Sequence, residues 1–265
     1  MKVADYIINY LADIGIKDVF VVYGAANGDL VDAFTRNDEI RYIAVMHEQG
    51  GGFAAEGYAK ITGKLGVMCA TSGPGGMNFV TPIGNCFYDS VPCLFITGQI
   101  NSKFMRPDES IRQIGFQETD IVSIVKPITK YAKMITDKND IKYELERAVH
   151  EATTGRPGPV LLDIPINIQK QDIDETTLIG YDNKLDILYN EEIINKQIDK
   201  YIEDLKNSER PCLMIGGGVR LSGAIEELLE LGRELKIPMF PTWNAPDIVC
   251  SDYEYYGGRI GTYGG

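Results

Sequence analysis

The first 165 residues alternate between amphipathic helical patterns and short apolar runs. Apolar residues recur at spacings of three and four over residues 2–14, which predicts a helix that Gly15 ends. Runs rich in β-branched and aromatic residues predict strands. The strands are expected at residues 18–23, 40–46, 65–71, 92–97 and 159–165, with helices that include residues 30–34, 48–63 and 139–155. Continuous apolar strands alternating with helices indicate an α/β fold, a parallel sheet with helices on both faces.

A second, partial α/β unit follows a polar segment. Residues 166–190 lack periodicity and have the composition of an interdomain linker. We therefore expect a first domain at residues 1–170, a linker at 171–190 and the beginning of a Rossmann-like domain at 191–265. Helices are expected at 191–207 and 224–235, with strands in CLMIGGG and PMFPTW. The chain ends in a glycine-rich loop, so we expect it to be part of a longer polypeptide.

The composition excludes several classes of protein. The 26 Lys and Arg residues against 38 Asp and Glu residues give a net charge of −12, which excludes a basic nucleic-acid clamp. The five cysteines form no C-x-x-C motif, so neither a disulfide framework nor a zinc site is indicated. No apolar window is long enough for a membrane span. We expect a cytoplasmic protein without membrane or nucleic-acid partners.

The segment MHEQGGGFAAEGYAK, residues 46–60, is the first candidate site. A strand is expected to end at Met46, which places Glu48 at the carboxyl edge of the sheet, where open α/β folds bind ligands. Gly50, Gly51 and Gly52 remove side chains from the first turn of the helix, so we expect something to approach that backbone closely. The alternative is a solvated first-turn acid favoured by the helix dipole. His47 is better explained as a packed residue at the strand end.

Two further glycine-rich turns are weaker signals. TSGPGGMNFVT at residues 71–81 could cradle a phosphate, but it has neither the P-loop lysine nor the spacing of G-x-G-x-x-G. GGGV at residues 216–219 leaves a dinucleotide-binding protein open as an alternative, without the G-x-G-x-x-G opening that such a site normally has.

Five blocks in order carry a specific resemblance: HEQGGGFAAEGYAK, ATSGPGGMN, FYDSVPCLFITGQ, GFQETDIV and GRPGPVLLDIP. Together they resemble the pyrimidine-binding domain of thiamine-diphosphate enzymes of the acetolactate synthase (acetohydroxyacid synthase) family. The resemblance covers residues 1 to about 170. The second unit is similar to the start of that family's central domain, which holds FAD in some members.

The resemblance implies an enzyme that decarboxylates a 2-keto acid and transfers the two-carbon unit, as in branched-chain amino acid biosynthesis. It assigns Glu48 as the catalytic acid that hydrogen-bonds the cofactor's pyrimidine and stabilises its imino tautomer. The other implied positions are Thr71, Pro74 and Asn78 along the aminopyrimidine, Gly24 and Ala25 over the reacting carbon, and Phe116 and Gln117 at the substrate channel of a neighbouring chain.

Three departures from the family pattern keep alternatives open. Ala25 stands where acetolactate synthases usually have a second glycine, Ile166 stands where a lysine is usual, and the arginine position near Arg112 does not align. A related decarboxylase, lyase or carboligase of sugar or surface-polysaccharide metabolism is therefore the second interpretation. A third is a non-catalytic half that pairs with a separate diphosphate-binding chain.

The resemblance also implies what this chain lacks. The family holds the cofactor's diphosphate and Mg2+ in a separate C-terminal domain with a G-D-G motif, and no such motif followed by asparagines occurs here. We therefore expect no metal ligands in this chain, an inactive isolated chain, and a homodimer or tetramer. Phe79, Phe87 and Tyr88 are expected to expose apolar surface that such an assembly covers.

Overall fold

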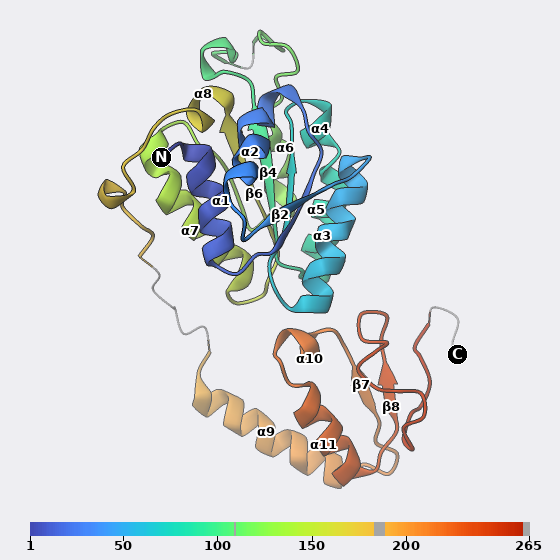
Figure 1. Cartoon of the computed structure of the whole chain (residues 1–265). Helices are drawn as coiled ribbons and strands as arrows, with labels where there is room; N and C mark the ends of the chain where they lie inside the picture. The colour runs from blue at the N-terminus through green and yellow to red at the C-terminus, as the bar shows by residue number, and fades with distance from the viewer. Residues whose placement is uncertain (109, 183–188, 262–265) are drawn as a thin grey trace. The chain divides into compact units, whose positions relative to one another are not determined.

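The computed structural model describes residues 1–108, 110–182 and 189–261. The chain divides into two compact units, residues 1–184 and 185–265, and each is described by itself. Figure 1 shows the helices and strands of both units along the chain.

The first unit is built on a six-stranded sheet in which every strand pairs in parallel with its neighbours, in the order β2-β1-β3-β4-β6-β5. This confirms the parallel α/β sheet expected from the apolar runs. The strands are β1 (Asp18–Val21), β2 (Arg41–Ala44), β3 (Gly66–Ala70), β4 (Cys93–Gln99), β5 (Tyr131–Met134) and β6 (Pro159–Pro165). Every residue of β3, β4 and β6 is buried, as expected for central strands covered on both faces.

Helices cover both faces of this sheet, each over its own apolar cluster (Figure 1). One face carries α1 (Val3–Asp13), α2 (Gly28–Ala33), α7 (Ile141–Thr153) and α8 (Ile166–Gln169). The other carries α3 (Glu48–Thr62), α5 (Val80–Asp89) and α6 (Ile121–Val125), and the short α4 (Pro74–Met77) precedes α5. The predicted cover of helices on both faces is therefore present.

The aromatic residues around α5 do not all lie at the surface. Phe79 was expected to be exposed, but it is fully buried and its ring lies 5.1 Å from that of Phe95 in an edge-to-face contact. It precedes α5 and turns toward the sheet, where an aromatic side chain removes much apolar surface from water. Phe87 is half-buried, and only Tyr88 is largely exposed, at 74%. The expected apolar surface is therefore smaller than the sequence indicated.

The segment expected to form the linker begins as part of the first unit. The backbone N–H of Ile173 donates to the carbonyl of Met1 at 2.8 Å, and the side chains of Ile173 and Leu178 are buried in the core beside α1. Two apolar residues in a polar run show no period, so the sequence pattern could not reveal their burial. Residues 183–188 of the expected linker lie outside the described residues.

The second unit pairs two short parallel strands with helices. Its elements are α9 (Glu191–Lys206), β7 (Leu213–Ile215), α10 (Gly218–Leu221), α11 (Ile225–Leu235) and β8 (Met239–Pro241), which agree with the predicted order. The last four residues of the glycine-rich tail, 262–265, lie outside the described residues. Across the described parts of both units, no helix combines the length and the apolar content that crossing a membrane requires.

Candidate functional site

The candidate site lies at the carboxyl edge of the first unit's sheet, where β1 and β3 are neighbours. From β1 the chain passes through α2 to β2 on one side, and from β3 it passes through α5 to β4 on the other side. The two connections also cover opposite faces of the sheet. Such a switch point leaves a crevice between the departing loops, which is where open α/β sheets bind ligands.

The two loops at this switch point are packed directly against each other. A Cβ at Gly24, after β1, would lie 2.5 Å from the Cβ of Thr71, after β3, so only glycine fits there. The hydroxyl of Thr71 accepts a hydrogen bond from the N–H of Ala26 at 3.1 Å, and Asn27 Oδ1 accepts one from the N–H of Gly24 at 2.8 Å. The side chain of Ala25 is exposed. Gly24 and Thr71, both predicted from the sequence, therefore form one wall of the site.

Glu48 is the first residue of α3 and is half-buried. His47 caps the helix, with Nδ1 accepting from the N–H of Gln49 at 3.1 Å, which gives it a structural role. Glu48 Oε2 accepts a hydrogen bond from Asn78 Nδ2 at 2.8 Å. Its Oε1 lies beside Gly75, where a Cβ would be only 3.4 Å away. One carboxylate oxygen is thus fixed by Asn78, and the other lies beside the backbone of Gly75.

Two of the three glycines at the start of α3 are approached closely, as expected from the sequence. A Cβ at Gly51 would lie 2.5 Å from Met68 Cε, and a Cβ at Gly52 would lie 2.5 Å from Pro82 Cγ. The groups that approach these two glycines are therefore the protein's own core side chains rather than a ligand. Gly50 has no atom within 4 Å of its Cβ position.

The loop after β3 also meets the segment that contains the predicted channel residues. Gln117 has a positive φ of 61°, and its Cβ would lie 2.7 Å from a Cβ at Gly73. Both oxygens of Glu118 accept backbone N–H groups of the preceding loop, at 2.7 and 2.9 Å. Phe116 is 83% exposed, and Pro74, at the start of α4, is exposed. Gln117 thus contacts the loop after β3 directly, whereas Phe116 points to solvent.

A buried polar cluster behind these loops was missed by the sequence interpretation. Asp163 in β6 is fully buried and accepts hydrogen bonds from Thr97 Oγ1 at 2.7 Å and Gln99 Nε2 at 2.9 Å. Burial raises the pKa of Asp163 to about 7, against the lowering effect of these two bonds. The signal was a single carboxylate in the otherwise apolar strand PVLLDIP.

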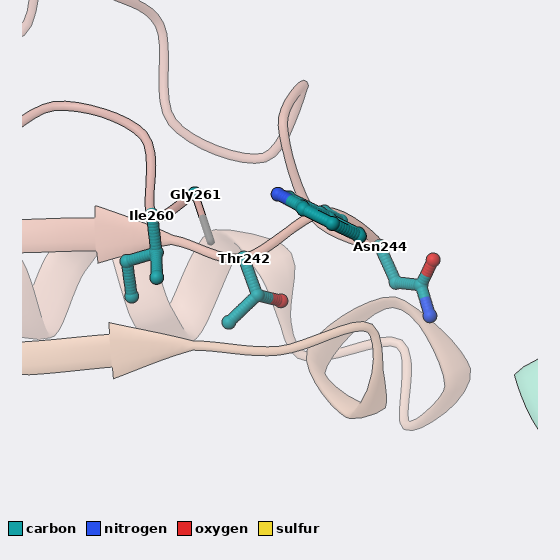
Figure 2. A pocket seen from close by; sticks show the side chains of 5 residues that line it. Thr242, Asn244, Ile260 and Gly261 are labelled. Carbon is teal, nitrogen blue, oxygen red and sulfur yellow. The ribbon is translucent and has the colours of Figure 1, made fainter. Parts of the chain in front are cut away.

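A second hollow lies in the second unit, at the end of β8. It has a volume of about 340 Å³ and is lined by Thr242, Trp243, Asn244, Ile260 and Gly261, as Figure 2 shows. Trp243 is 72% exposed. The GGGV turn follows β7, and a Cβ at Gly217 would lie 3.2 Å from Asn244 Cβ, so this turn packs on the same loop.

Each of the two units matches the model of a known protein family. The model of the thiamine pyrophosphate enzyme N-terminal TPP binding domain matches residues 1–124, and that of the thiamine pyrophosphate enzyme central domain matches residues 198–265. This chain belongs to the thiamine pyrophosphate enzymes. Thiamine pyrophosphate is thiamine diphosphate, so the family expected from the five sequence blocks is confirmed.

Relatives from bacteria, plants and archaea match nearly the whole chain. The acetolactate synthase large subunit of Corynebacterium glutamicum is 37% identical over all of this chain and 41% of its own length. Acetolactate synthase 2, chloroplastic, of Nicotiana tabacum is 40% identical over 91% of this chain and 35% of its own length. The probable acetolactate synthase large subunit of Methanocaldococcus jannaschii is 36% identical over all of this chain and 44% of its own length. The chain therefore spans less than half the length of these relatives.

The residues at the switch point fit the pyrimidine half of thiamine diphosphate. Glu48 offers a carboxylate oxygen next to the backbone of Gly75, at the carboxyl edge of the sheet. In the described parts of the chain, no group of three or more His, Cys, Asp or Glu side chains could hold a metal ion.

Proposed function

We propose that the complete gene product decarboxylates a 2-keto acid and transfers the two-carbon unit to a second carbonyl compound, as an acetolactate synthase does. The relatives that support this proposal all carry that name. An acetolactate synthase would act in branched-chain amino acid biosynthesis.

The observation that carries the proposal is the environment of Glu48. When bound, thiamine diphosphate supplies the carbon that attacks the keto acid. Asn78 fixes Oε2 of Glu48, so that Oε1 is the atom positioned to share a proton with a pyrimidine ring nitrogen. A half-buried carboxylate attracts a protonated ring nitrogen more strongly than a solvated one, because the interaction between the two charges is less screened. Gly24 and Thr71 pack against each other beside Glu48. Thr71, Pro74 and Asn78 line the position of the pyrimidine ring.

The remaining parts of the site are proposed to come from outside this chain. We assign the diphosphate and Mg2+ to a domain beyond residues 1–265, contributed by another copy in a homodimer or tetramer. The exposed side chain of Phe116 in the first unit supports such an interface, because a large apolar side chain at the edge of the site favours association. Phe116 and Gln117 would then line the substrate channel of the neighbouring copy.

A second candidate function rests on Ala25. Its exposed methyl stands where the family usually has glycine, and Ile166, in place of the usual lysine, is a half-buried residue at the start of α8. A methyl near the reacting centre changes which 2-keto acid or acceptor fits. A decarboxylase, lyase or carboligase acting on a different 2-keto acid would use the same Glu48 chemistry.

FAD binding is a further part of the proposal for the second unit. The hollow beside Trp243 has the volume of a single ring system, with an aromatic surface on which a flat ring can stack. It is too small for a whole dinucleotide, so the described residues would supply only part of a flavin site.

Product analysis of the complete gene product tests the proposed function. The enzyme is incubated with thiamine diphosphate, Mg2+ and pyruvate, and both CO2 and acetolactate are measured. Acetolactate formed in proportion to CO2 supports the first candidate, and CO2 with another coupling product supports the second. Absence of CO2 release from pyruvate and from a panel of other 2-keto acids would contradict both.

A further inference from the structure

Asp163 is a carboxylate buried in the centre of the first unit. It belongs to β6, where the neighbouring residues are apolar, and its side chain is fully shielded from solvent. Burying a carboxyl group is costly unless its oxygens are hydrogen-bonded. Both oxygens have partners from β4: Oδ1 accepts from Thr97 and Oδ2 accepts from Gln99. An apolar residue would fill the same place in the sheet without the free-energy cost of burying a carboxyl group. The hydrogen-bond partners of Asp163 therefore indicate what the carboxyl group does.

The first partner, Thr97, connects Asp163 to the loop after β3, which contacts Glu48 through Asn78. Thr97 donates its hydroxyl to Asp163, and this bond fixes the rotamer of the side chain. The methyl group of Thr97 then lies 3.3 Å from the Cβ position of Gly76. Gly76 follows Gly75, whose backbone faces Glu48 Oε1. The hydroxyl bond inside the sheet therefore determines how the loop after β3 rests on β4.

The second partner connects Asp163 to the segment of Gln117. The side-chain amide of Gln99 donates both to Asp163 Oδ2 and to the carbonyl of Thr119, at 2.9 and 2.8 Å. Its Oε1 accepts from the N–H of Ile100 at 3.0 Å, so the orientation of the amide is settled. Thr119 lies two residues after Gln117, which adopts a left-handed backbone and contacts Gly73.

We propose that Asp163 is a positioning residue: through Thr97 and Gln99 it holds residues 72–78 and 114–120 in place around Glu48. The arrangement joins two loops that are far apart in sequence to one buried group. The inference rests on the proposed function for the meaning of the Glu48 site, but the positions of the loops can be measured without cofactor or substrate.

Hydrogen exchange of the complete gene product, followed by mass spectrometry without cofactor, tests this proposal. Asp163→Val removes both acceptors and suits a strand, and each lost hydrogen bond is worth about 1 kcal/mol, or about fivefold in local opening. We expect exchange about five- to tenfold faster in peptides covering residues 72–78 and 114–120. Asp163→Asn should rescue both peptides to within about twofold, because its carbonyl can accept from Gln99 and its amide can donate to Thr97.

A matched control separates positioning from general loss of stability. Glu144→Leu also removes a buried carboxyl, one that accepts a hydrogen bond from Tyr131 between α7 and β5. It should leave both loop peptides unchanged. If Asp163→Val and Glu144→Leu accelerate exchange in these peptides equally, or if Asp163→Val leaves them as in the parent, Asp163 has no positioning role.

Thr97→Ser keeps the test decisive even if Asp163→Val does not fold. It retains the hydroxyl that bonds Asp163 and deletes only the methyl that rests on Gly76. Exchange should rise in the peptide covering residues 72–78 and stay unchanged in that covering 114–120. Unchanged exchange in both would overturn the proposal. Because these readouts need no turnover, they can succeed when product analysis fails, and the two failures are distinguishable.

Discussion

Glu48 has surroundings that an ordinary first-turn acid does not need. A carboxylate at a helix start is favoured by the helix dipole wherever it points. Here Asn78 fixes one oxygen, and the second lies beside Gly75, which has no side chain. These two contacts come from the loop after β3, which the dipole explanation does not involve. These contacts therefore favour a role for Glu48 in recognising a ligand.

Gly75→Ala tests whether the bare backbone beside Glu48 is part of the binding surface. The new methyl would lie 2.8 Å from Thr71 Cγ2, so the loop after β3 must shift, and it would also contact Glu48 Oε1 at 3.4 Å. Overpacking of this kind costs about 1 to 3 kcal/mol, and we expect thiamine diphosphate affinity of the complete gene product to fall about tenfold. Gly84→Ala in α5, with its nearest contact at 3.9 Å, is the matched control. Equal affinities for both variants in calorimetry would contradict this assignment.

The raised pKa of Asp163 predicts that the free energy of unfolding depends on pH. Its pKa of about 7 in the folded protein lies above the unfolded value of about 3.9, so the folded state binds the proton more tightly. The stabilising contribution is complete below about pH 4 and is lost as the pH rises through 7. Between pH 5 and 8 the parent should lose about 2 to 3 kcal/mol of unfolding free energy relative to Asp163→Asn. Urea unfolding at both pH values measures this, and parallel pH profiles for the two proteins would argue against it.

The site residues that the sequence predicted are those that follow strand ends. Glu48, Thr71 and Asn78 could be predicted from the sequence, because the carboxyl ends of parallel strands lie together at one edge of the sheet. Asp163 and Thr97 act from inside strands, where a polar residue gives no indication of its partner. Their pairing depends on the register of β4 with β6, which places Thr97 opposite Asp163 and is fixed only by the folded sheet.

Among the strands, the apolar pattern predicted the buried ones and the edge strand β2, but it did not predict the other edge strand, β5. β3, β4 and β6 are fully buried, so most of their residues are apolar. β5 has no buried residue and only four residues, and its sequence YAKM has no strand signature. It becomes a strand because it pairs with β6, an interaction between segments about thirty residues apart that no local pattern contains.

The helix α3 offers a matched pair of glycine substitutions. Gly57 has no atom within 4 Å of its Cβ position, so Gly57→Ala should stabilise the first unit by about 0.5 to 1 kcal/mol through helix propensity. Gly52→Ala would place a methyl 2.5 Å from the rigid ring of Pro82 and should destabilise it by about 1 to 3 kcal/mol. Thermal unfolding of both variants measures the difference. Equal shifts of the same sign would show that α3 does not pack on α5 as described.

At the scale of the whole molecule, residues 1–265 contain the pyrimidine side of a cofactor site and, within the described residues, no metal-binding cluster. The net charge of −12 also opposes the approach of a diphosphate. We expect residues 1–265 alone to bind thiamine diphosphate weakly, even with Mg2+, and to show no turnover. Calorimetry that gave a submicromolar dissociation constant for this polypeptide would place the diphosphate site within it.

In the proposed function Glu48 activates the cofactor, and exchange of the thiazolium proton in the cofactor-loaded complete gene product reports this activation without a substrate. Glu48→Gln keeps the size and the contact with Asn78 but removes the charge that favours a protonated pyrimidine nitrogen. A positioned acid or base is worth about 10²- to 10⁴-fold in rate, so exchange should slow by about that factor while the unfolding free energy is nearly unchanged. An exchange rate within a factor of about two of the parent would contradict the catalytic assignment, since it leaves only the effect of the helix dipole.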